Sequence, residues 1–225
     1  MENRWRETFL EWSKSDEFQA KVQQATEIIR NALTERNVYS TFSGGKDSLV
    51  VSHMANLIKP GILVLHIDYG KYLIPRPIHK EIRKIAKEMN WNFEIYAHPI
   101  FRLPPERTIG VMGIVLSDLA KHMQEKGYDG VFVGLRSAES TKRKQRIKTE
   151  FSLTAIKEYY PVGNWSWLDI WAYIVSRELP YLWFYDRYAK VLSWENARFT
   201  TMFDPEFEKF GAPAVDGVLS PRWRR

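Results

Sequence analysis

The stretch Thr41-Phe42-Ser43-Gly44-Gly45-Lys46-Asp47-Ser48-Leu49 decides the fold, because it joins a predicted strand directly to a predicted helix. Residues 38–42 form a short apolar run typical of a buried strand, and residues 49–58 predict a helix that Lys59-Pro60-Gly61 ends. A strand-to-helix turn exposes unpaired N–H groups at the positive end of the helix dipole. Two glycines let this backbone approach a phosphate closely, and Lys46 adds a full positive charge. The stretch therefore predicts an anion-binding loop made of Ser43, Gly44, Gly45, Lys46, Asp47 and Ser48.

Two common nucleotide-binding motifs do not describe this loop. A Walker A sequence would need glycine at position 40 and Ser or Thr at position 47, where Ser40 and Asp47 stand. No G-x-G-x-x-G dinucleotide fingerprint follows a strand either. The simpler alternative is a tight turn with a solvated lysine, but the full hexapeptide between a strand and a helix favours a functional loop.

Outward from the loop, apolar strands alternate with helices. Residues 62–67, 92–96 and 130–133 predict strands, and residues 78–90 and 114–126 predict helices. This alternation predicts an α/β fold with a doubly wound parallel sheet, in which ligands bind beyond the carboxyl ends of the strands. The glycine-rich polar segments follow strands one, two and four, so we expect them to converge on one edge.

The flanking regions suggest three parts. Residues 1–36 predict an N-terminal helical segment, residues 37–185 the nucleotide-binding α/β domain, and residues 186–225 an irregular C-terminal extension with a mobile tail at 220–225. Ser166-Trp167-Leu168-Asp169 fits a capping box that opens a helix through about Ser176.

The amino-acid composition excludes several kinds of bond and functional site. The 225 residues contain no cysteine, which excludes disulfides, iron–sulfur clusters, thiolate zinc sites and a cysteine nucleophile. The five histidines do not fall in a metal-ligand spacing, so we expect no permanent transition metal. The net charge of +6 suits a polyanionic ligand without identifying one. With no signal peptide and no apolar run of roughly 20 residues, we expect a cytoplasmic protein that does not enter a membrane.

The hexapeptide Ser-Gly-Gly-Lys-Asp-Ser resembles the PP-loop of the ATP pyrophosphatases, also called adenine nucleotide α-hydrolases. Within that superfamily the chain is similar to the phosphoadenosine phosphosulfate (PAPS) reductase family, which includes the small subunit of bacterial sulfate adenylyltransferase. Three more segments carry the likeness over about residues 38–185: VLHIDYG at 64–70, VGLRSAES at 133–140, and YPV at 160–162 with Trp165, Asp169, Trp171, Tyr173 and Ile174. The resemblance implies a Rossmann-like adenine nucleotide α-hydrolase fold.

The resemblance also implies roles for the matching residues. The PP-loop would hold phosphates, with Lys46 neutralising their charge. Asp68, which ends the second strand, could meet the sugar or a magnesium ion, or could simply cap a turn. Arg136, just after Gly134, is the best candidate for a second phosphate clamp, because guanidinium pairs bidentately with phosphate. We expect Glu139 to orient Arg136.

A run of basic residues at 142–148 follows this arginine, and such a run predicts a solvated loop. Its position favours Arg143 and Arg146 as bases that close over the anionic end of the ligand. Three tryptophans, Trp165, Trp167 and Trp171, are more typical of a core than of a base-stacking site.

The chemistry implied by the resemblance is cleavage of ATP between its α and β phosphates. Catalysis of this step depends mainly on Mg²⁺ and on the positioning of the reacting groups. The reductase branch binds adenosine phosphosulfate (APS) or PAPS and uses a C-terminal cysteine, so we expect this cysteine-free chain not to be a thiol-dependent reductase. Three hypotheses stay open: an adenylyl-transferring enzyme like sulfate adenylyltransferase, an ATP- or APS/PAPS-binding module without turnover, and a tRNA-modifying enzyme. A homodimer and a GTPase-type partner subunit are both compatible with the sequence.

Overall fold

The computed structural model describes residues 1–70, 74–103, 112–150, 152 and 154–197, together with two short strands at 212–213 and 219–220. Its centre is a five-stranded sheet in the order β3-β2-β1-β4-β5, and every neighbouring pair is parallel. The strands are β1 (Val38–Thr41), β2 (Leu63–Asp68), β3 (Asn92–Ala97), β4 (Gly130–Phe132) and β5 (Lys157–Tyr159). The predicted α/β fold with a doubly wound parallel sheet is confirmed.

The strand order creates the ligand-binding position expected of such a sheet. β1 lies between β2 and β4, so the chain runs outward from β1 first in one direction and then in the other. In open parallel sheets this reversal opens a crevice at the carboxyl ends of the strands. The PP-loop follows β1 at that edge.

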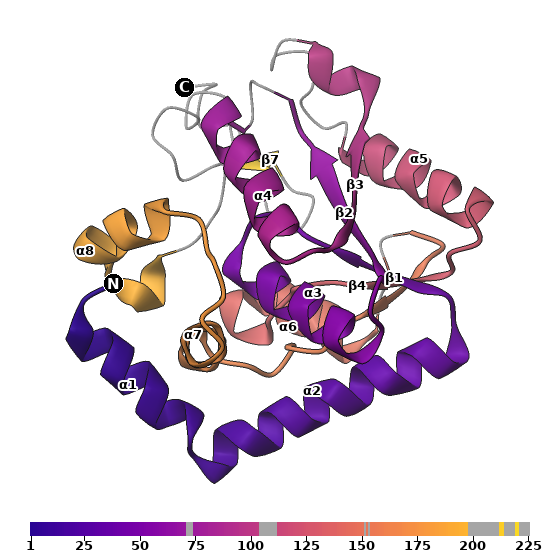
Figure 1. Cartoon of the computed structure of the whole chain (residues 1–225). Coiled ribbons are helices and arrows are strands. Elements are labelled where there is room, and N and C mark those ends of the chain that lie inside the picture. The colour runs from indigo at the N-terminus through magenta and orange to yellow at the C-terminus, as the bar shows by residue number, and fades with distance from the viewer. Residues whose placement is uncertain are drawn as a thin grey trace.

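Helices cover both faces of the sheet (Figure 1). They are α1 (Asn3–Ser13), α2 (Asp16–Glu35), α3 (Lys46–Ile58), α4 (Arg76–Glu88), α5 (Met112–Glu125), α6 (Thr141–Lys148), α7 (Trp167–Ser176) and α8 (Phe184–Asn196), with short 3₁₀ turns η1 (Pro99–Arg102) and η3 (Ser137–Glu139). Among the described residues, no helix has the length and apolar composition needed to cross a bilayer. The expected cytoplasmic location stays a prediction.

The alternation of side chains along β1 explains the two layers. Val38 and Phe42 point into a large core shared with α1, α2, α3, α4, α7 and α8. Tyr39 points to the opposite face, into a smaller core that includes Leu119 and Met123 of α5. Ser40 lies between Val38 and Phe42 in the sequence and is also buried. Its hydroxyl forms a hydrogen bond with the hydroxyl of Ser52 at 2.9 Å, which links β1 to α3.

The N-terminal segment is helical as predicted, but it is divided into two helices rather than one. The break falls at Ser15, whose hydroxyl accepts the backbone N–H of Phe18 at 3.2 Å and so caps α2. Figure 1 shows α1 and α2 meeting at this break and lying outside α7 and α3. The predicted capping box of α7 is confirmed, since Ser166 and Asp169 exchange both hydrogen bonds.

The basic run at 142–148 was predicted as a loop, and this prediction is wrong. It belongs to α6, because Ser140 accepts the backbone N–H of Arg143 and caps the helix. β5 and α8 were also absent from the sequence prediction. The extension beyond residue 197, including the tail at 220–225, lies outside the described residues apart from the antiparallel pair 212–213 and 219–220. The division of the chain after residues 36 and 185 stays a prediction.

Candidate nucleotide-binding site

The PP-loop turns sharply between β1 and α3, and its glycines make the turn possible. Gly44 has φ of +90°, a conformation that side chains disfavour. A Cβ atom at this position would also lie 2.8 Å from Cδ1 of Ile82 in α4. Gly45 is the N-cap of α3, so Lys46, Asp47 and Ser48 form the first helical turn. This turn places the positive end of the helix at the sheet edge.

Hydrogen bonds hold the loop in shape. Ser48 Oγ accepts the backbone N–H of Ser43 at 3.1 Å and donates to the carbonyl of Gly45 at 2.9 Å. The N–H of Gly45 donates to Ser43 Oγ at 3.2 Å. A distant residue contributes as well, since the hydroxyl of Tyr185 in α8 accepts the backbone N–H of Lys46 at 3.0 Å. The loop is therefore fixed from within and from the C-terminal helices.

Two buried cations and one half-buried carboxylate meet at the start of α3. The ammonium of Lys46 lies 3.2 Å from Oδ2 of Asp47, and Nε of Arg136 pairs with Oδ1 of the same carboxylate. The side chains of Lys46 and Arg136 are only 1% and 3% exposed. Burial alone would raise the pKa of Asp47, but the two cations outweigh burial and hold that pKa below its usual range. Asp47 is therefore the shared counter-ion of two desolvated cations.

Arg136 extends this network away from the loop. Its Nη2 lies 3.2 Å from Oε1 of Glu139, and Arg143 pairs with the other oxygen of Glu139. The expected contact between Glu139 and Arg136 is thus present. Gly134 brings the end of β4 against the loop, because a Cβ there would lie 2.5 Å from the backbone nitrogen of Ser48.

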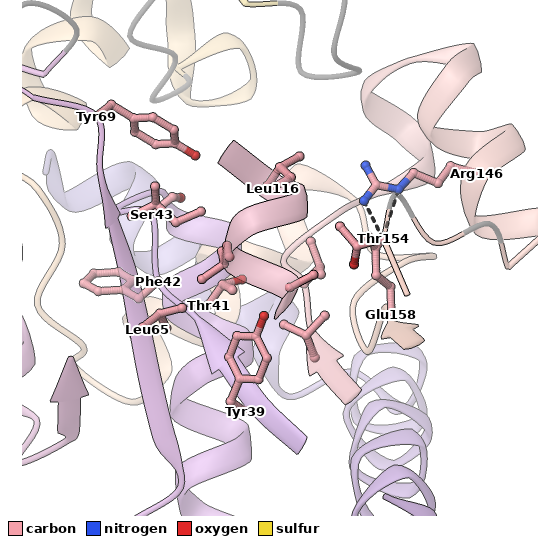
Figure 2. A pocket seen from close by; sticks show the side chains of 15 residues that line it. Tyr39, Thr41, Phe42, Ser43, Leu65, Tyr69, Leu116, Arg146, Thr154 and Glu158 are labelled. Carbon is pink, nitrogen blue, oxygen red and sulfur yellow. Dashed lines mark hydrogen bonds and ion pairs between the residues drawn. The ribbon is translucent and has the colours of Figure 1, made fainter. Parts of the chain in front are cut away.

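A cavity of about 200 Å³ opens beside the loop on the α5 face of the sheet (Figure 2). Ser43 is common to the loop and the cavity wall. Most of the lining is apolar and comes from alternating positions of β1, β2 and β4 and from one side of α5: Tyr39, Thr41, Leu65, Ile67, Val131, Val133, Leu116, Leu119 and Ala120. Tyr69, Arg146, Thr154 and Glu158 add polar groups.

Arg146 and Glu158 form one wall of this cavity, and Figure 2 shows the paired groups. Nε of Arg146 donates to Oε2 of Glu158 at 3.0 Å, and the hydroxyl of Tyr160 donates to the same oxygen at 2.5 Å. Burial lowers the pKa of Arg146, but the Glu158 carboxylate more than offsets it and the net pKa is raised. Arg146 is therefore a permanent cation at the cavity, already paired with a carboxylate.

Asp68 ends β2 at the same sheet edge. Its Oδ1 accepts the backbone N–H of Gly70 at 2.7 Å, so the turn-capping contact that the sequence allowed is present. Nε2 of His79 lies 3.2 Å from this oxygen. Nδ1 of His79 in turn lies 3.3 Å from Nε2 of His66, whose pKa burial lowers to about 4. Among the described residues, no three His, Asp or Glu side chains gather as a complete metal centre would require.

The structure brings most of the predicted site residues together. Ser43 to Ser48, Gly134 and Arg136 share direct contacts, Asp68 ends the neighbouring strand at the same edge, and Arg143 and Arg146 lie on α6 and are each paired with a carboxylate. Their roles in binding stay predictions. Sequence reasoning missed Tyr185, His79 and Glu158. Tyr185 and Glu158 lie on elements that the periodicity did not reveal, and His79 was seen only as part of an amphipathic helix.

Comparisons with known proteins find similar sequences and a shared fold. The model of the phosphoadenosine phosphosulfate reductase domain matches residues 37–202. Phosphoadenosine 5'-phosphosulfate reductase of Synechococcus sp. is 25% identical over 199 residues, 78% of this chain and 82% of the relative. Sulfate adenylyltransferase subunit 2 of Zymomonas mobilis is 28% identical over 188 residues, covering 65% of this chain and 60% of that protein. The crystal structure of PAPS reductase from Candida auris, a phosphate complex, shares the fold with a TM-score of 0.52, 21% identity and coverage of 77% and 92%.

Proposed function

The chain belongs to the phosphoadenosine phosphosulfate reductase domain family, and we propose that it binds ATP at the PP-loop and transfers the adenylyl group to an oxyanion acceptor. The buried pair of cations, Lys46 and Arg136, at the N-terminus of α3 carries this proposal. Burying a cation is costly unless anions accompany it, as Asp47 and Glu139 do here, and the positive helix end beside these cations provides a place for a phosphate group.

Two features of the loop favour a negatively charged ligand. The cations of Lys46, Arg136 and Arg143 gather beside it, held by the carboxylates of Asp47 and Glu139. The positive end of the α3 helix dipole lies at the same place. Phosphate groups match both features.

The cavity beside Ser43 suits the adenine base. Its volume of about 200 Å³ is below the about 300–1,000 Å³ typical of sites that enclose a whole ligand, so it accommodates part of a nucleotide. With the base among Tyr39, Leu65 and Val131, the sugar passes Ser43 and the phosphates reach the N-terminal end of α3. Asp68 lies at the end of the neighbouring strand.

The proposed reaction needs little covalent participation from the protein. An oxygen of the acceptor attacks Pα of ATP, a new O–Pα bond forms, and the bond between Pα and the α–β bridging oxygen breaks. Pyrophosphate leaves with that electron pair. Lys46 and the positive end of the α3 dipole stabilise the charge that develops on the leaving group, and Arg136 keeps Asp47 directed at Lys46. Mg²⁺ bound to the phosphates supplies further charge neutralisation.

Two facts favour adenylyl transfer over reduction for this chain. The sequence has no cysteine, so it offers no thiol for reducing a sulfonucleotide. One relative bears the name of an adenylyltransferase subunit. By analogy with that name, we propose that the chain assembles with a second polypeptide that raises the rate of turnover.

The test is a titration of the purified protein with ATP, APS and PAPS by calorimetry in Mg²⁺, with pyrophosphate release measured in the ATP samples. We expect ATP binding, and pyrophosphate release that rises with sulfate or another oxyanion acceptor. Tight binding of APS or PAPS with no pyrophosphate from ATP under any acceptor would instead support a non-catalytic binding module. No binding of any of the three nucleotides would overturn the assignment of the site.

A further inference from the structure

Two His–Asp pairs at similar distances behave differently in this molecule. Nε2 of His98 donates a regular hydrogen bond to Oδ2 of Asp118 at 3.1 Å. Nε2 of His79 lies 3.2 Å from Oδ1 of Asp68, yet it makes no hydrogen bond with any residue in the described part of the chain. The two imidazoles are equally buried, at 14% and 13% exposed. The nitrogen of His79 is thus aimed beside the carboxylate oxygen rather than at it.

The hydrogen bonds behind His79 determine which of its nitrogens carries a proton. The carbonyl of Phe42 can only accept, so Nδ1 of His66 donates to it at 2.8 Å. In the neutral ring, Nε2 of His66 is then an acceptor, and the facing Nδ1 of His79, at 3.3 Å, must be the donor. A neutral His79 therefore has its lone pair on Nε2, next to the Asp68 carboxylate.

A buried imidazole lone pair beside a carboxylate oxygen is the arrangement of two metal ligands. Ligands about 2.1 Å from a divalent ion and at right angles to each other lie about 3.0 Å apart, close to the 3.2 Å seen here. Metal-binding histidines donate their other ring N–H to a fixed acceptor, as His79 does to His66. We propose that Asp68 and His79 together bind a divalent cation.

The position of this pair connects it to the PP-loop. His79 lies one helical turn before Ile82, the residue that packs directly over Gly44. Asp68 ends β2, which is hydrogen-bonded to β1 immediately before the loop. Two protein ligands leave most of a coordination shell to water and to phosphate oxygens. The participation of the nucleotide rests on the proposed function, whereas binding of the metal to the two side chains does not.

The ligand types identify the class of metal. Carboxylate and phosphate oxygens suit Mg²⁺ and Mn²⁺ alike, but an imidazole nitrogen favours the transition metal. The site therefore binds Mn²⁺ in preference to Mg²⁺, and His79 is the specificity-determining residue.

The experiment is a titration of Mn²⁺ into the full chain, followed by electron paramagnetic resonance of free Mn²⁺, with and without ATP and with Mg²⁺ as competitor. We expect His79→Ala and Asp68→Asn each to weaken Mn²⁺ binding by about tenfold or more. His79→Ala should also remove the preference for Mn²⁺ over Mg²⁺, a change that loss of packing alone would not cause. His98→Ala removes a histidine of the same burial from an ordinary His–Asp hydrogen bond, and should change Mn²⁺ affinity less than twofold.

The outcomes separate this inference from the proposed function. Wild-type protein that binds ATP but binds no Mn²⁺ beyond that carried by the nucleotide would overturn the cation site and leave the nucleotide site standing. Equal Mn²⁺ affinity in wild type and His79→Ala would also overturn it, because His79 would then not be a ligand of the metal. Mn²⁺ binding that depends on His79 in a protein that does not bind ATP would support the cation site while refuting the nucleotide site.

Discussion

Two neighbouring regions of the molecule have different kinds of interior, one ionic and one aromatic. At the PP-loop, Lys46, Asp47 and Arg136 are desolvated together as an ionic network. Where α1, α7 and α8 meet, the interior is aromatic, and the ring of Trp171 lies 4.6 Å from that of Trp194 and 6.3 Å from that of Phe9. The aromatic cluster gains stability from packing, whereas the ionic network pays a desolvation penalty, a difference that the proposed anion-binding role of the loop would explain.

Tyr185 belongs to both regions. Its ring packs against Trp171 at 5.2 Å, and its hydroxyl accepts the backbone N–H of Lys46. The Tyr185 side chain of α8 thus links the aromatic cluster to the loop. Mutations that affect stability and anion binding separately test whether the two regions have these different roles.

The largest effect is expected from Trp171→Ala. Removing this fully buried indole leaves a cavity among Phe9, Tyr181 and Trp194, and should lower the free energy of unfolding by about 3–5 kcal/mol. Urea denaturation measures the loss. Trp183→Ala, at an indole that is 43% exposed, is the control and should cost less than about 1 kcal/mol. Equal losses in the two variants would contradict a stabilising aromatic cluster.

Asp47→Asn should lower the free energy of unfolding by about 3 kcal/mol, because two buried cations lose their counter-ion. Added inorganic phosphate should restore part of this stability by occupying the same place, as denaturation with and without phosphate would show.

Asp169→Asn is the matched control for that experiment. Asp169 is a buried carboxylate, paired with Lys21 at 2.9 Å and with the indole of Trp12, but it lies away from the loop. This variant should lose stability without recovery in phosphate. Recovery in both variants, or in neither, would mean that the loop network is not an anion site.

The sequence was sufficient for the features that depend on local pattern. The glycine pair, the apolar runs and the Ser166–Asp169 capping box predicted β1, α3 and α7 because each is encoded by adjacent residues. Contacts between distant segments could not be read in this way. Nothing near Tyr185 reveals that its hydroxyl meets Lys46, 139 positions away. The charge run at 142–148 also hid a helix, because its inward-facing cations, Arg143 and Arg146, are satisfied by Glu139 and Glu158 from other elements.

His53 makes stability depend on pH in the large core. Burial, with a smaller contribution from Arg177, lowers its pKa to about 4, whereas an unfolded histidine titrates near 6.5. The stabilisation is therefore complete above about pH 6.5 and is lost as the pH falls toward 4, by about 2 kcal/mol.

His53→Gln removes this titration and retains a polar group facing the hydroxyl of Tyr173, which lies 3.0 Å from Nδ1 of His53. Denaturation at pH 7.5 and pH 4.5 should show a smaller loss in the variant than in the wild type. An identical loss in both proteins would show that His53 is not protonated differently on unfolding.

The smallest effect is expected from Tyr185→Phe, which removes the link between the two regions. Loss of the hydrogen bond to Lys46 should cost about 1 kcal/mol of stability and weaken ATP binding about threefold. Tyr181→Phe is the control, since its hydroxyl donates to Asp186 at 3.2 Å within the same aromatic cluster. Tyr181→Phe should leave ATP affinity unchanged, and a loss of affinity there would refute the special role of Tyr185.

The central claim is that the loop from Ser43 to Ser48 binds the phosphates of ATP, and calorimetric titration of wild type, Lys46→Ala and Lys126→Ala with ATP tests it most directly. Lys126 is a surface lysine paired with Glu94, so its removal changes the net charge equally. We predict that Lys46→Ala keeps its fold but loses ATP binding by about 100-fold or more, whereas Lys126→Ala binds like wild type. Unchanged ATP affinity in a folded Lys46→Ala protein would contradict the account.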